Sequence, residues 1–562
     1  MENNINQSFD AIVVGSGISG GWAAKELTEK GLKTLLLERG RNVEHVKDYP
    51  TALKNPWEFE NRLMLTNEDK ITNPIQSTIY DESNKHFFVN DQDHPYVQTK
   101  PFNWIRGYQM GGRSLTWGRQ VYRLSDLDFN ANNLDGHGVD WPLRYAELKE
   151  WYDHVERFIG ISGNKDNIAH LPDGEFLPPM EMNCIETHFK EAINKNFNDR
   201  KVIHGRVANL TKGYTNRGPC QYRNLCSRGC PFGGYFSSNS STIPAALNTG
   251  NLTVRPHSIV YEVIYDPNKG VAKGVRIIDE VTKKTYDYYA KIIFLNASTI
   301  ATTSILLQSI SSTFPNGLGN GSGQIGHNLM DHHKSCGAYG THDGYEHYYY
   351  EGRRPTGIYI PRFRNLNGNS NDVNFLRGYG YQADGERSEW QDLMKTTDGF
   401  GADYKAKLTT PGKWTLWMGA WGECLPNYNN KVTLSKTKKD KWGLPLIEID
   451  FEFGENELEM RKDAIKNASL MLEVAGFKEI KTFDYEPPGG TTVHEMGTAR
   501  MGNDPKTSVL NKFNQMHEVK NVFITDGSCM TSGGSQNPSL TYMALTARAC
   551  DYAISELKKQ NI

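Results

Sequence analysis

The first clear pattern along the chain is an apolar run at residues 9–14, then a glycine-rich turn, then an apolar stretch around residues 23–27. A second apolar run follows at residues 34–37. Short runs of this kind predict buried strands, and the stretch between them has the spacing of a helix. The sequence therefore predicts a β–α–β unit near the start of the chain.

Further along, apolar positions at residues 141–161 recur at helical spacing and predict one long amphipathic helix. Residues 252–294 change to short apolar runs separated by turns, which predict a strand meander. Alternating segments in residues 345–453 predict an antiparallel sheet in a second domain. Residues 521–524 and 538–557 predict a last buried strand and a last helix. The mixture places the chain in the α/β class.

Length and charge narrow the function classes. The 562 residues exceed what one hydrophobic core organises, so we expect two intertwined domains with room for a cofactor. The 63 basic and 65 acidic residues give a net charge of −2, with no basic stripe, which argues against nucleic acid as a partner. No run approaches the roughly 18 apolar residues of a direct membrane span. Met1 to Asp10 lacks the basic and apolar regions of a signal peptide, so export would need a separate carrier.

A dinucleotide-binding turn is the first motif with chemical content. Gly15, Gly17 and Gly20 form the pattern G-x-G-x-x-G directly between the predicted strand and helix, where backbone amides can approach a pyrophosphate. Glu38 ends the next strand, in position to bind a ribose. The ending Glu38-Arg39-Gly40 resembles FAD-binding rather than NAD-binding versions of this turn.

Three more motifs follow in a fixed order. They are Gly111-Gly112-Arg113-Ser114-Leu115-Thr116-Trp117-Gly118, then His494-Glu495-Met496-Gly497-Thr498-Ala499-Arg500-Met501-Gly502, then Thr525-Asp526-Gly527-Ser528 with Asn537-Pro538-Ser539-Leu540-Thr541. Together with the N-terminal turn, they resemble the glucose–methanol–choline (GMC) oxidoreductase family from end to end. Four ordered motifs make chance agreement improbable.

This resemblance implies the GMC fold, in which a Rossmann-like FAD-binding domain is joined to a substrate domain built on an antiparallel sheet. The FAD-binding domain is expected to be discontinuous and to comprise residues 1–135, 200–335 and 486–562. The substrate domain then comprises residues 136–199 and 336–485.

The resemblance also implies which residues meet the cofactor. Besides the N-terminal turn, Glu38 and Arg39, the expected FAD contacts are Gly111, Gly112 and Ser114 over the flavin, Val260 and Ala297 near the adenosine, Asp526 at the ribityl-pyrophosphate, and Asn537 with Pro538. In relatives with a covalent flavin, a histidine takes the place that Thr116 occupies here. We therefore expect a non-covalent FAD.

His494 matches the catalytic histidine of the family, and Asn537 matches its active-site partner, which is a second histidine in many relatives. An alcohol loses hydride readily only while its hydroxyl proton is being removed, and a histidine with an ordinary pKa near ~6.5 suits that task. Asn537 offers donors and an acceptor that can hold the hydroxyl in the reactive geometry. His494 is therefore expected to be the base and Asn537 its partner.

Three of the eight cysteines, Cys220, Cys226 and Cys230, crowd into one loop rich in Gly, Arg and Asn. Three thiolates can bind iron or zinc, whereas a disulfide would leave one cysteine over. Zinc would need a fourth ligand, for which His204 and His257 are candidates. The alternative is structural or unpaired thiols.

Within the family, the cysteine spacing resembles that of iron–sulfur sugar dehydrogenases, whose three cysteines hold a three-iron, four-sulfur (3Fe-4S) cluster. Cys220-Gln221-Tyr222 through Cys230, followed by Tyr235-Phe236-Ser237-Ser238-Asn239-Ser240-Ser241-Thr242, is similar to the catalytic subunit of FAD-dependent glucoside 3-dehydrogenases. Such a cluster implies a dehydrogenase that passes electrons to an external acceptor. The resemblance further implies a small helper subunit that carries the export signal, a cytochrome c acceptor and a periplasmic location, with a cytoplasmic location as the alternative.

The expected substrate is a sugar or glucoside oxidised at carbon 3, and this specificity rests on the resemblance alone. Gln382, in the second predicted domain, is the candidate for a contact to sugar hydroxyls, although a strand residue without such a contact is an equal alternative. Two other functions stay open. One is a pyranose or glycoside oxidase that passes electrons to oxygen, and the other is a flavoprotein electron-transfer subunit without alcohol chemistry.

Overall fold

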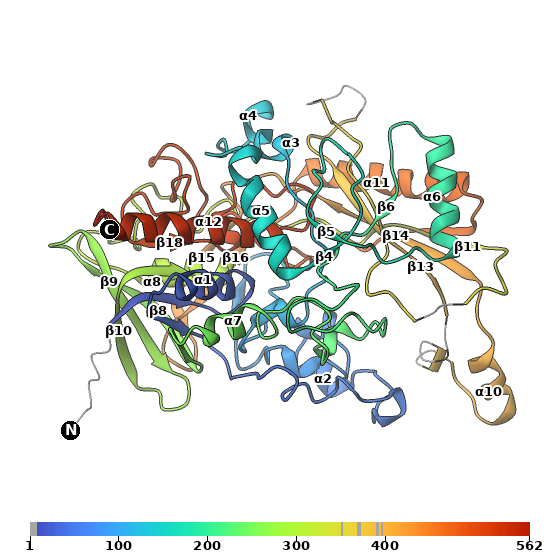
Figure 1. The fold of residues 1–562 in the computed structure, drawn as a ribbon, viewed down its shortest axis with the longest axis horizontal. Coiled ribbons are helices and arrows are strands. Elements are labelled where there is room, and N and C mark those ends of the chain that lie inside the picture. The colour runs from blue at the N-terminus through green and yellow to red at the C-terminus, as the bar shows by residue number, and fades with distance from the viewer. Residues whose placement is uncertain (1–7, 350–351, 368–372, 389, 391–392, 395–396) are drawn as a thin grey trace.

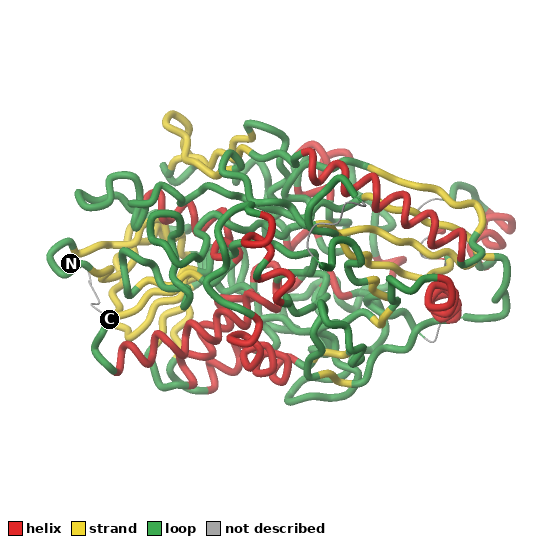
Figure 2. The backbone as a smooth tube through the Cα atoms, turned by 90° about the horizontal axis from the view of Figure 1, so that it is seen from above, coloured by secondary structure: helices red, strands yellow, loops and turns green. Residues whose placement is uncertain are grey.

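A computed structural model describes residues 8–349, 352–367, 373–388, 390, 393–394 and 397–562. Residues 1–7, which make up most of the segment without a signal-peptide pattern, lie outside the described residues. Two β-sheets lie towards opposite ends of the molecule, each covered by helices (Figures 1 and 2). The mixed α/β class predicted from the sequence is confirmed.

The first sheet contains the predicted β–α–β unit. Its strands run in the order β7 (Leu252–Arg255), β2 (Thr34–Leu37), β1 (Ser8–Val14), β10 (Thr285–Leu295), β9 (Val271–Asp279) and β8 (Ser258–Asp266), with β18 (Val522–Ile524) pairing with β10. The strands β7, β2, β1, β10 and β18 pair in parallel, whereas β10, β9 and β8 form the predicted antiparallel meander. Because β10 has eleven residues, its first half pairs with β9 and its second half with β1 and β18.

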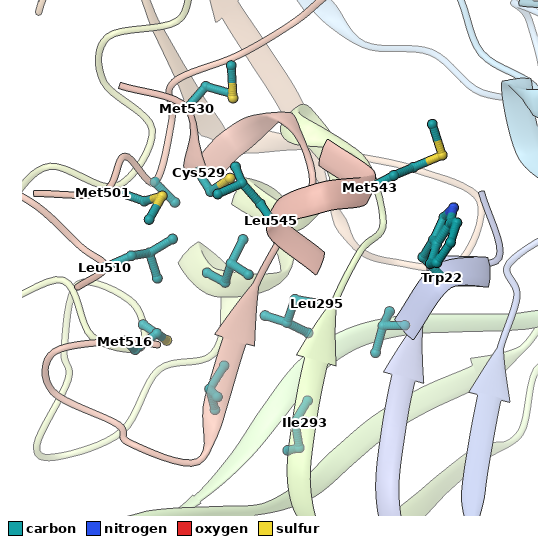
Figure 3. Close-up of a cluster of buried hydrophobic side chains, with 14 of the residues drawn as sticks. Trp22, Ile293, Leu295, Met501, Leu510, Met516, Cys529, Met530, Met543 and Leu545 are labelled. Atoms are coloured by element: carbon teal, nitrogen blue, oxygen red, sulfur yellow. The ribbon is translucent and has the colours of Figure 1, made fainter. Parts of the chain in front are cut away.

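Helices bury the apolar faces of this sheet and fix the C-terminal part of the chain on it. Helix α1 (Ile18–Glu29) packs against α7 (Thr242–Asn248) and α12 (Ser539–Lys558), and α12 packs against α5 (Tyr145–Ile159), which is the predicted long amphipathic helix. Figure 3 shows side chains of α12 and of the preceding loops, including Met501, Cys529 and Leu545, in one buried cluster with Leu295 of β10. Full burial of such a side chain contributes roughly 1.5–3 kcal/mol. The loops that carry His494 and Asn537 are therefore anchored to a rigid core.

The second sheet is antiparallel, as predicted. Its order is β17 (Lys478–Asp484), β11 (Cys336–His342), β14 (Trp414–Gly422), β13 (Tyr379–Arg387), β12 (Ile358–Ile360) and β6 (Ile203–His204). Helix α11 (Glu455–Val474) covers one face with Met460, Ala464, Ala468, Met471 and Leu472, which recur at helical spacing and are fully buried. Helix α6 (Cys184–Asn196) packs against the same sheet and against α11.

Part of the predicted second sheet belongs elsewhere. Strands β15 (Lys431–Lys439) and β16 (Pro445–Asp450) pair with each other and, through β16, with β3 (Val97–Gln98) in a separate three-stranded sheet. The prediction of a single sheet over residues 345–453 was wrong here, because alternation of apolar and polar residues marks a half-buried strand but does not identify its partner. The turn between β15 and β16 instead lines the large cavity described below with Asp440, Trp442 and Leu444.

Short elements complete the described structure: α2 (Asn67–Thr72), α3 (Asp126–Phe129), α4 (Ala131–Asp135), α8 (Thr299–Gln308), α10 (Gly401–Thr409), and the two-stranded pair β4 (Ile161–Ser162) and β5 (Phe176–Leu177). The division into domains at the residue numbers given above stays a prediction. The strand β6 lies within the segments assigned to the FAD-binding domain, yet it pairs with β12 of the second sheet. Among the described residues, no helix is both long and apolar enough to cross a membrane.

Candidate active site

One large cavity brings most of the predicted site residues together. It encloses about 2270 Å³ of empty space, its open mouth included. Of the residues predicted from the sequence, its lining contains Gly15, Gly17, Glu38, Arg39, Gly112, Ser114, Val260, Ala297, His494, Asp526, Asn537 and Pro538. Motifs that are hundreds of residues apart in the sequence therefore face one space.

The N-terminal turn leaves this space open where a pyrophosphate is expected. Gly15 has a φ of +95°, and a Cβ added to it would lie 2.3 Å from the backbone oxygen of Asn296. A Cβ added to Gly20 would lie 1.9 Å from the Gly15 oxygen, so these two glycines are needed for packing within the protein. A Cβ on Gly17, at the N-terminus of α1, would meet no protein atom within 4 Å. Of the two glycines of this turn that line the cavity, Gly15 and Gly17, only Gly17 has empty space where a Cβ would lie.

Glu38 ties this turn to the predicted flavin loop. Its Oε2 accepts hydrogen bonds from the Ser16 hydroxyl at 2.5 Å and the Ser16 amide at 3.2 Å, and its Oε1 accepts one from the Gly40 amide. The Ser16 hydroxyl also accepts a hydrogen bond from the Gly111 amide at 2.9 Å. Complete burial raises the pKa of Glu38. Gly20 and Gly111 do not line the cavity but pack against residues that do. The contact of Glu38 with a ribose stays a prediction.

An ion pair joins the flavin loop to the loop that carries His494. Arg113 donates to both carboxylate oxygens of Glu495, at 2.8 and 3.3 Å, in the bidentate arrangement that fixes both side chains. Arg113 and Glu495 both line the cavity. Thr116 also lines it, in the loop position where covalent-flavin relatives carry a histidine.

Asp331 holds the backbone on which His494 sits. Its carboxylate accepts hydrogen bonds from the amides of Gly490 at 2.8 Å and His494 at 3.2 Å, and from the hydroxyl of Thr492. Met330 and Met496 exchange two backbone hydrogen bonds, which join the Asp331 segment to the other side of the same loop. Burial raises the pKa of Asp331 to about 6. The backbone of His494 is thus fixed by contacts on both sides of it in the chain.

His332 determines which nitrogen of His494 is free to act as a base. The Nε2 of His332 lies 2.8 Å from the backbone oxygen of Gly534, and its Nδ1 lies 2.8 Å from Nδ1 of His494. Burial lowers the pKa of His332, so its ring is neutral and carries one N–H, which the Gly534 carbonyl requires at Nε2. Its Nδ1 is then an acceptor, and His494 donates from Nδ1. The lone pair of His494 consequently lies on Nε2, which has no hydrogen bond to any residue that the structure describes.

The same environment predicts a displaced pH profile. Burial, and then the neighbouring ring of His332 and the cations Lys334 and Arg113, hold the pKa of His494 well below its ordinary value near ~6.5. Protonated His494 cannot accept a proton, so activity is lost as pH falls through this lowered pKa. We expect the acid limb for anaerobic flavin reduction by an alcohol, measured between about pH 5 and 9, to lie below pH ~6.5. A limb at or above ~6.5 would contradict this assignment. Lys334→Gln, which removes one cation, should move the limb upward.

Asn537 is held from the second sheet. Its Oδ1 accepts a hydrogen bond from Nε2 of Gln382 at 2.9 Å, and Gln382 does not appear in the cavity lining. The structure therefore places Gln382 behind Asn537, and its contact with a sugar stays a prediction. Since this hydrogen bond turns Oδ1 of Asn537 towards Gln382, its Nδ2 donors remain for a ligand in the cavity.

The three clustered cysteines do not form a preformed metal site. The sulfur of Cys220 accepts a hydrogen bond from the Tyr222 amide at 3.4 Å, and that of Cys230 accepts one from the Gly234 amide at 3.3 Å. Burial raises the pKa of Cys220 to about 11 and also raises the pKa of Cys226. Throughout the described part of the chain, no three His, Cys, Asp or Glu side chains form a group that could hold a metal ion. The expected 3Fe-4S cluster is therefore not supported by the geometry.

The two candidates for a fourth zinc ligand, His204 and His257, make hydrogen bonds to other residues. His204 bonds to Asn164 through Nδ1, and His257 bonds to Glu280 through Nδ1 at 2.8 Å. The cysteine loop nevertheless borders the active-site cavity, because its turn Cys226–Arg228 packs against the flavin-loop turn Gly112–Leu115 and places Ser227 in the lining.

Sequence reasoning missed several residues of this site, above all Asp331, His332 and Gln120. A usable signal existed for the first two, because Asp331-His332-His333 is a run of three titratable residues directly after the apolar pair Leu329-Met330. All three are almost completely buried. Titratable residues that are buried together often belong to functional sites.

Comparisons with known proteins identify the family and the fold. Two family models described as GMC oxidoreductase match residues 9–334 and 426–546. The chain is 26% identical to the fructose dehydrogenase large subunit of Gluconobacter japonicus over 99% of this chain and 100% of that one. It is 29% identical to 2-methyl-1,2-propanediol dehydrogenase of Mycolicibacterium austroafricanum, covering 97% and 94% of the two chains. The crystal structure of pyridoxine 4-oxidase from Mesorbium loti shares the fold, with a TM-score of 0.61 at 15% identity over 97% and 99% of the chains.

Proposed function

This chain belongs to the GMC oxidoreductase family as an FAD-dependent oxidoreductase of alcohols or sugars, and we propose that it oxidises carbon 3 of a glucoside or related sugar to a ketone. The observation that carries the proposal is that His494 and Asn537 line the same cavity as the dinucleotide turn. The base and its partner thus face the space into which the cofactor binds. The choice of a sugar and of carbon 3 rests on the motif resemblance, and the name of the fructose dehydrogenase relative supports a sugar.

The residues present fit FAD. Gly17 leaves open space at the N-terminus of the twelve-residue helix α1, where amides and the helix dipole favour a pyrophosphate. The Asn296 side chain, which also lines the cavity, has a buried Oδ1 without a partner among the described residues. Gly112, Ser114 and Thr116 would line the flavin. When bound, FAD supplies the hydride acceptor of the reaction.

The chain's own residues supply the proton chemistry and the alignment. His494 accepts the hydroxyl proton at Nε2, the nitrogen that its bond to His332 leaves unprotonated. Asn537 donates from Nδ2 to the same oxygen, because Gln382 occupies its Oδ1. These two contacts fix the hydroxyl from two directions, which leaves the hydrogen on carbon in one orientation.

A sugar panel tests the proposal. The holoenzyme is mixed anaerobically with glucosides, free hexoses and simple alcohols, and loss of flavin absorbance is recorded together with the carbon that becomes the ketone. Reduction by a glucoside with a 3-keto product supports the proposal. Reduction by other alcohols only would reject the sugar specificity, and no reduction by any alcohol would favour an electron-transfer subunit without alcohol chemistry.

We propose that the electrons pass to an external acceptor, as in a dehydrogenase, and an oxidase is the alternative. Oxygen consumption during turnover, compared with reduction of an artificial acceptor dye or cytochrome c, separates the two. Binding of a 3Fe-4S cluster by Cys220, Cys226 and Cys230 has only the sequence spacing in its favour. Iron analysis of anaerobically purified protein tests it directly, since flavin absorbance without iron would reject the cluster.

A non-covalent FAD is expected because Thr116 replaces the histidine of covalent-flavin relatives. Denaturation of the holoenzyme with trichloroacetic acid should leave all flavin in the supernatant and none on the precipitated protein. Yellow colour retained by the precipitate would contradict this prediction.

We also propose a small helper subunit and a periplasmic location reached by co-export with it. Support comes from the motif resemblance and from the relative that is named a large subunit. Co-expression with a neighbouring small open reading frame that carries a signal peptide, followed by cell fractionation, tests the proposal. A chain that stays in the cytoplasmic fraction in its native host would favour the alternative location.

A further inference from the structure

We propose that Tyr122, Gln120 and Gln382 form a directed hydrogen-bond relay that positions the side-chain amide of Asn537 as a donor to the reacting hydroxyl. The inference rests on the alcohol oxidation proposed above and goes beyond it. Tyr122, Gln120 and Gln382 are positioning residues. They fix the orientation of the Asn537 amide, so that Asn537 faces the reacting hydroxyl as a donor and not as an acceptor.

The relay is continuous over four side chains. The hydroxyl of Tyr122 donates to Oε1 of Gln120 at 2.5 Å, and Nε2 of Gln120 donates to Oε1 of Gln382 at 2.9 Å. Nε2 of Gln382 then donates to Oδ1 of Asn537 at 2.9 Å. Gln120 and Asn537 line the cavity, whereas Tyr122 and Gln382 lie behind them.

The direction of the relay follows from its first member. The hydroxyl of Tyr122 faces Oε1 of Gln120, which can only accept, and burial raises the pKa of Tyr122 well above the ordinary value, so the hydroxyl keeps the proton that it donates there. An amide presents one acceptor and one donor group, so a Gln120 that accepts at Oε1 presents Nε2 to the next residue. The same step repeats at Gln382 and at Asn537. Hydrogen bonds aligned in one direction also polarise one another, which strengthens the last donor.

The surroundings hold the relay rigid. The ring of Tyr122 stacks on that of Tyr359 with centroids 4.0 Å apart. Tyr359 pairs with Gln382 across strands β12 and β13, so the first and third members of the relay share one support. The backbone of Gln120 is bridged to Val207, and Asn537 directly precedes Pro538, the N-cap residue of helix α12. The donor at the end of the relay therefore has little freedom to rotate.

A donor is what the reaction needs at this point. Negative charge develops on the oxygen as the Nε2 of His494 removes the hydroxyl proton, and a fixed N–H donor stabilises that charge. The opposite orientation of Asn537 would direct its carbonyl oxygen at the same charge and oppose proton removal. A donor that is already oriented does not have to be realigned during the reaction. Pre-orientation of Asn537 therefore lowers the barrier.

A double-mutant cycle tests the relay against a direct contact of Gln382 with the sugar. Gln382→Met keeps the length of the side chain but removes both hydrogen bonds, and we expect anaerobic flavin reduction by a glucoside to slow by about 10-fold or more. In an Asn537→Ala background, where no amide remains to orient, Gln382→Met should change the rate less than about 2-fold. Tyr122→Phe should follow the same pattern with a smaller effect.

The control is Tyr381→Phe, which removes a buried hydroxyl one residue from Gln382 that bonds to the Ala464 oxygen and not to the relay. It should leave the rate unchanged. If Gln382→Met slows the Asn537→Ala enzyme by the same factor as the unmodified enzyme, Gln382 acts independently and the relay is wrong.

A binding measurement provides a readout without turnover. The 3-deoxy-3-fluoro analogue of glucose accepts but cannot donate a hydrogen bond at the reacting position, whereas 3-deoxyglucose can do neither. Titrations followed by the flavin absorbance should show tighter binding of the fluoro compound, and Gln382→Met should abolish that preference. Equal binding of the two analogues by the unmodified enzyme would overturn the relay. If both analogues behave as expected but no glucoside reduces the flavin, the proposed function fails and the donor assignment stands.

Discussion

Replacing His494 by alanine is expected to slow reduction of the flavin by the alcohol roughly 10²- to 10⁴-fold, the usual contribution of a positioned general base. The reason is geometric as well as chemical. His494 lines the cavity, its Nδ1 is committed to His332, and its Nε2 is the unprotonated nitrogen. Burial keeps the pKa low, so the base form dominates at neutral pH without help from another residue. Anaerobic stopped-flow measurement of flavin absorbance gives the rate directly.

The matched control is His137→Ala, since His137 is exposed and lies outside the cavity lining. It should reduce its flavin at the unmodified rate. Both variants should bind FAD with unchanged stoichiometry, which separates loss of the base from loss of the cofactor. A His494→Ala protein that holds FAD and is reduced at a near-normal rate would remove His494 from the mechanism.

His494 also shows which features of a candidate active site can be predicted from the sequence. The motif around it predicts a catalytic histidine, because such residues occur there in a short continuous pattern. The motif does not show which ring nitrogen of His494 is unprotonated, because that depends on His332, a residue 162 positions away. Gln382 illustrates the same limit, since the sequence predicts it as a contact to sugar hydroxyls, and that contact stays a prediction. The structure places its amide on Asn537, 155 positions away.

The same distinction between local patterns and long-range contacts applies to the fold. Strands β1 and β2 and helices α1 and α12 follow from local patterns, because each is a continuous apolar run with its own turn signals. The pairing of β16 with β3 does not, since Glu448 and Val97 are 351 positions apart and the pattern of neither strand identifies the other. Helix α11 was not identified, although Met460, Ala464, Ala468, Met471 and Leu472 carry a clear helical stripe. Local order was predictable, and the choice of long-range partners was not.

Substitution of Gly17 by alanine is expected to give a folded protein that binds FAD about 10- to 100-fold more weakly, the range that corresponds to overpacking by one methyl group. An added Cβ meets no protein atom within 4 Å, and the residue has a negative φ of −66°. The substitution should therefore leave the structure and stability of the apoprotein unchanged. The methyl group would instead enter the space at the N-terminus of α1 where the pyrophosphate binds. Titration of apoprotein with FAD, followed by flavin fluorescence, measures the affinity.

Two further variants make the result specific to cofactor approach. Gly15→Ala combines a φ of +95° with a Cβ 2.3 Å from the Asn296 oxygen, so it should lower the melting temperature of the apoprotein itself. Gly213→Ala, at an exposed glycine whose Cβ would lie 3.9 Å from its nearest neighbour, should affect neither stability nor FAD binding. Because a ligand stabilises only the form that binds it, Gly17→Ala should keep the apoprotein melting temperature but lose most of the increase that FAD produces. Full retention of that increase would show that the pyrophosphate does not approach Gly17.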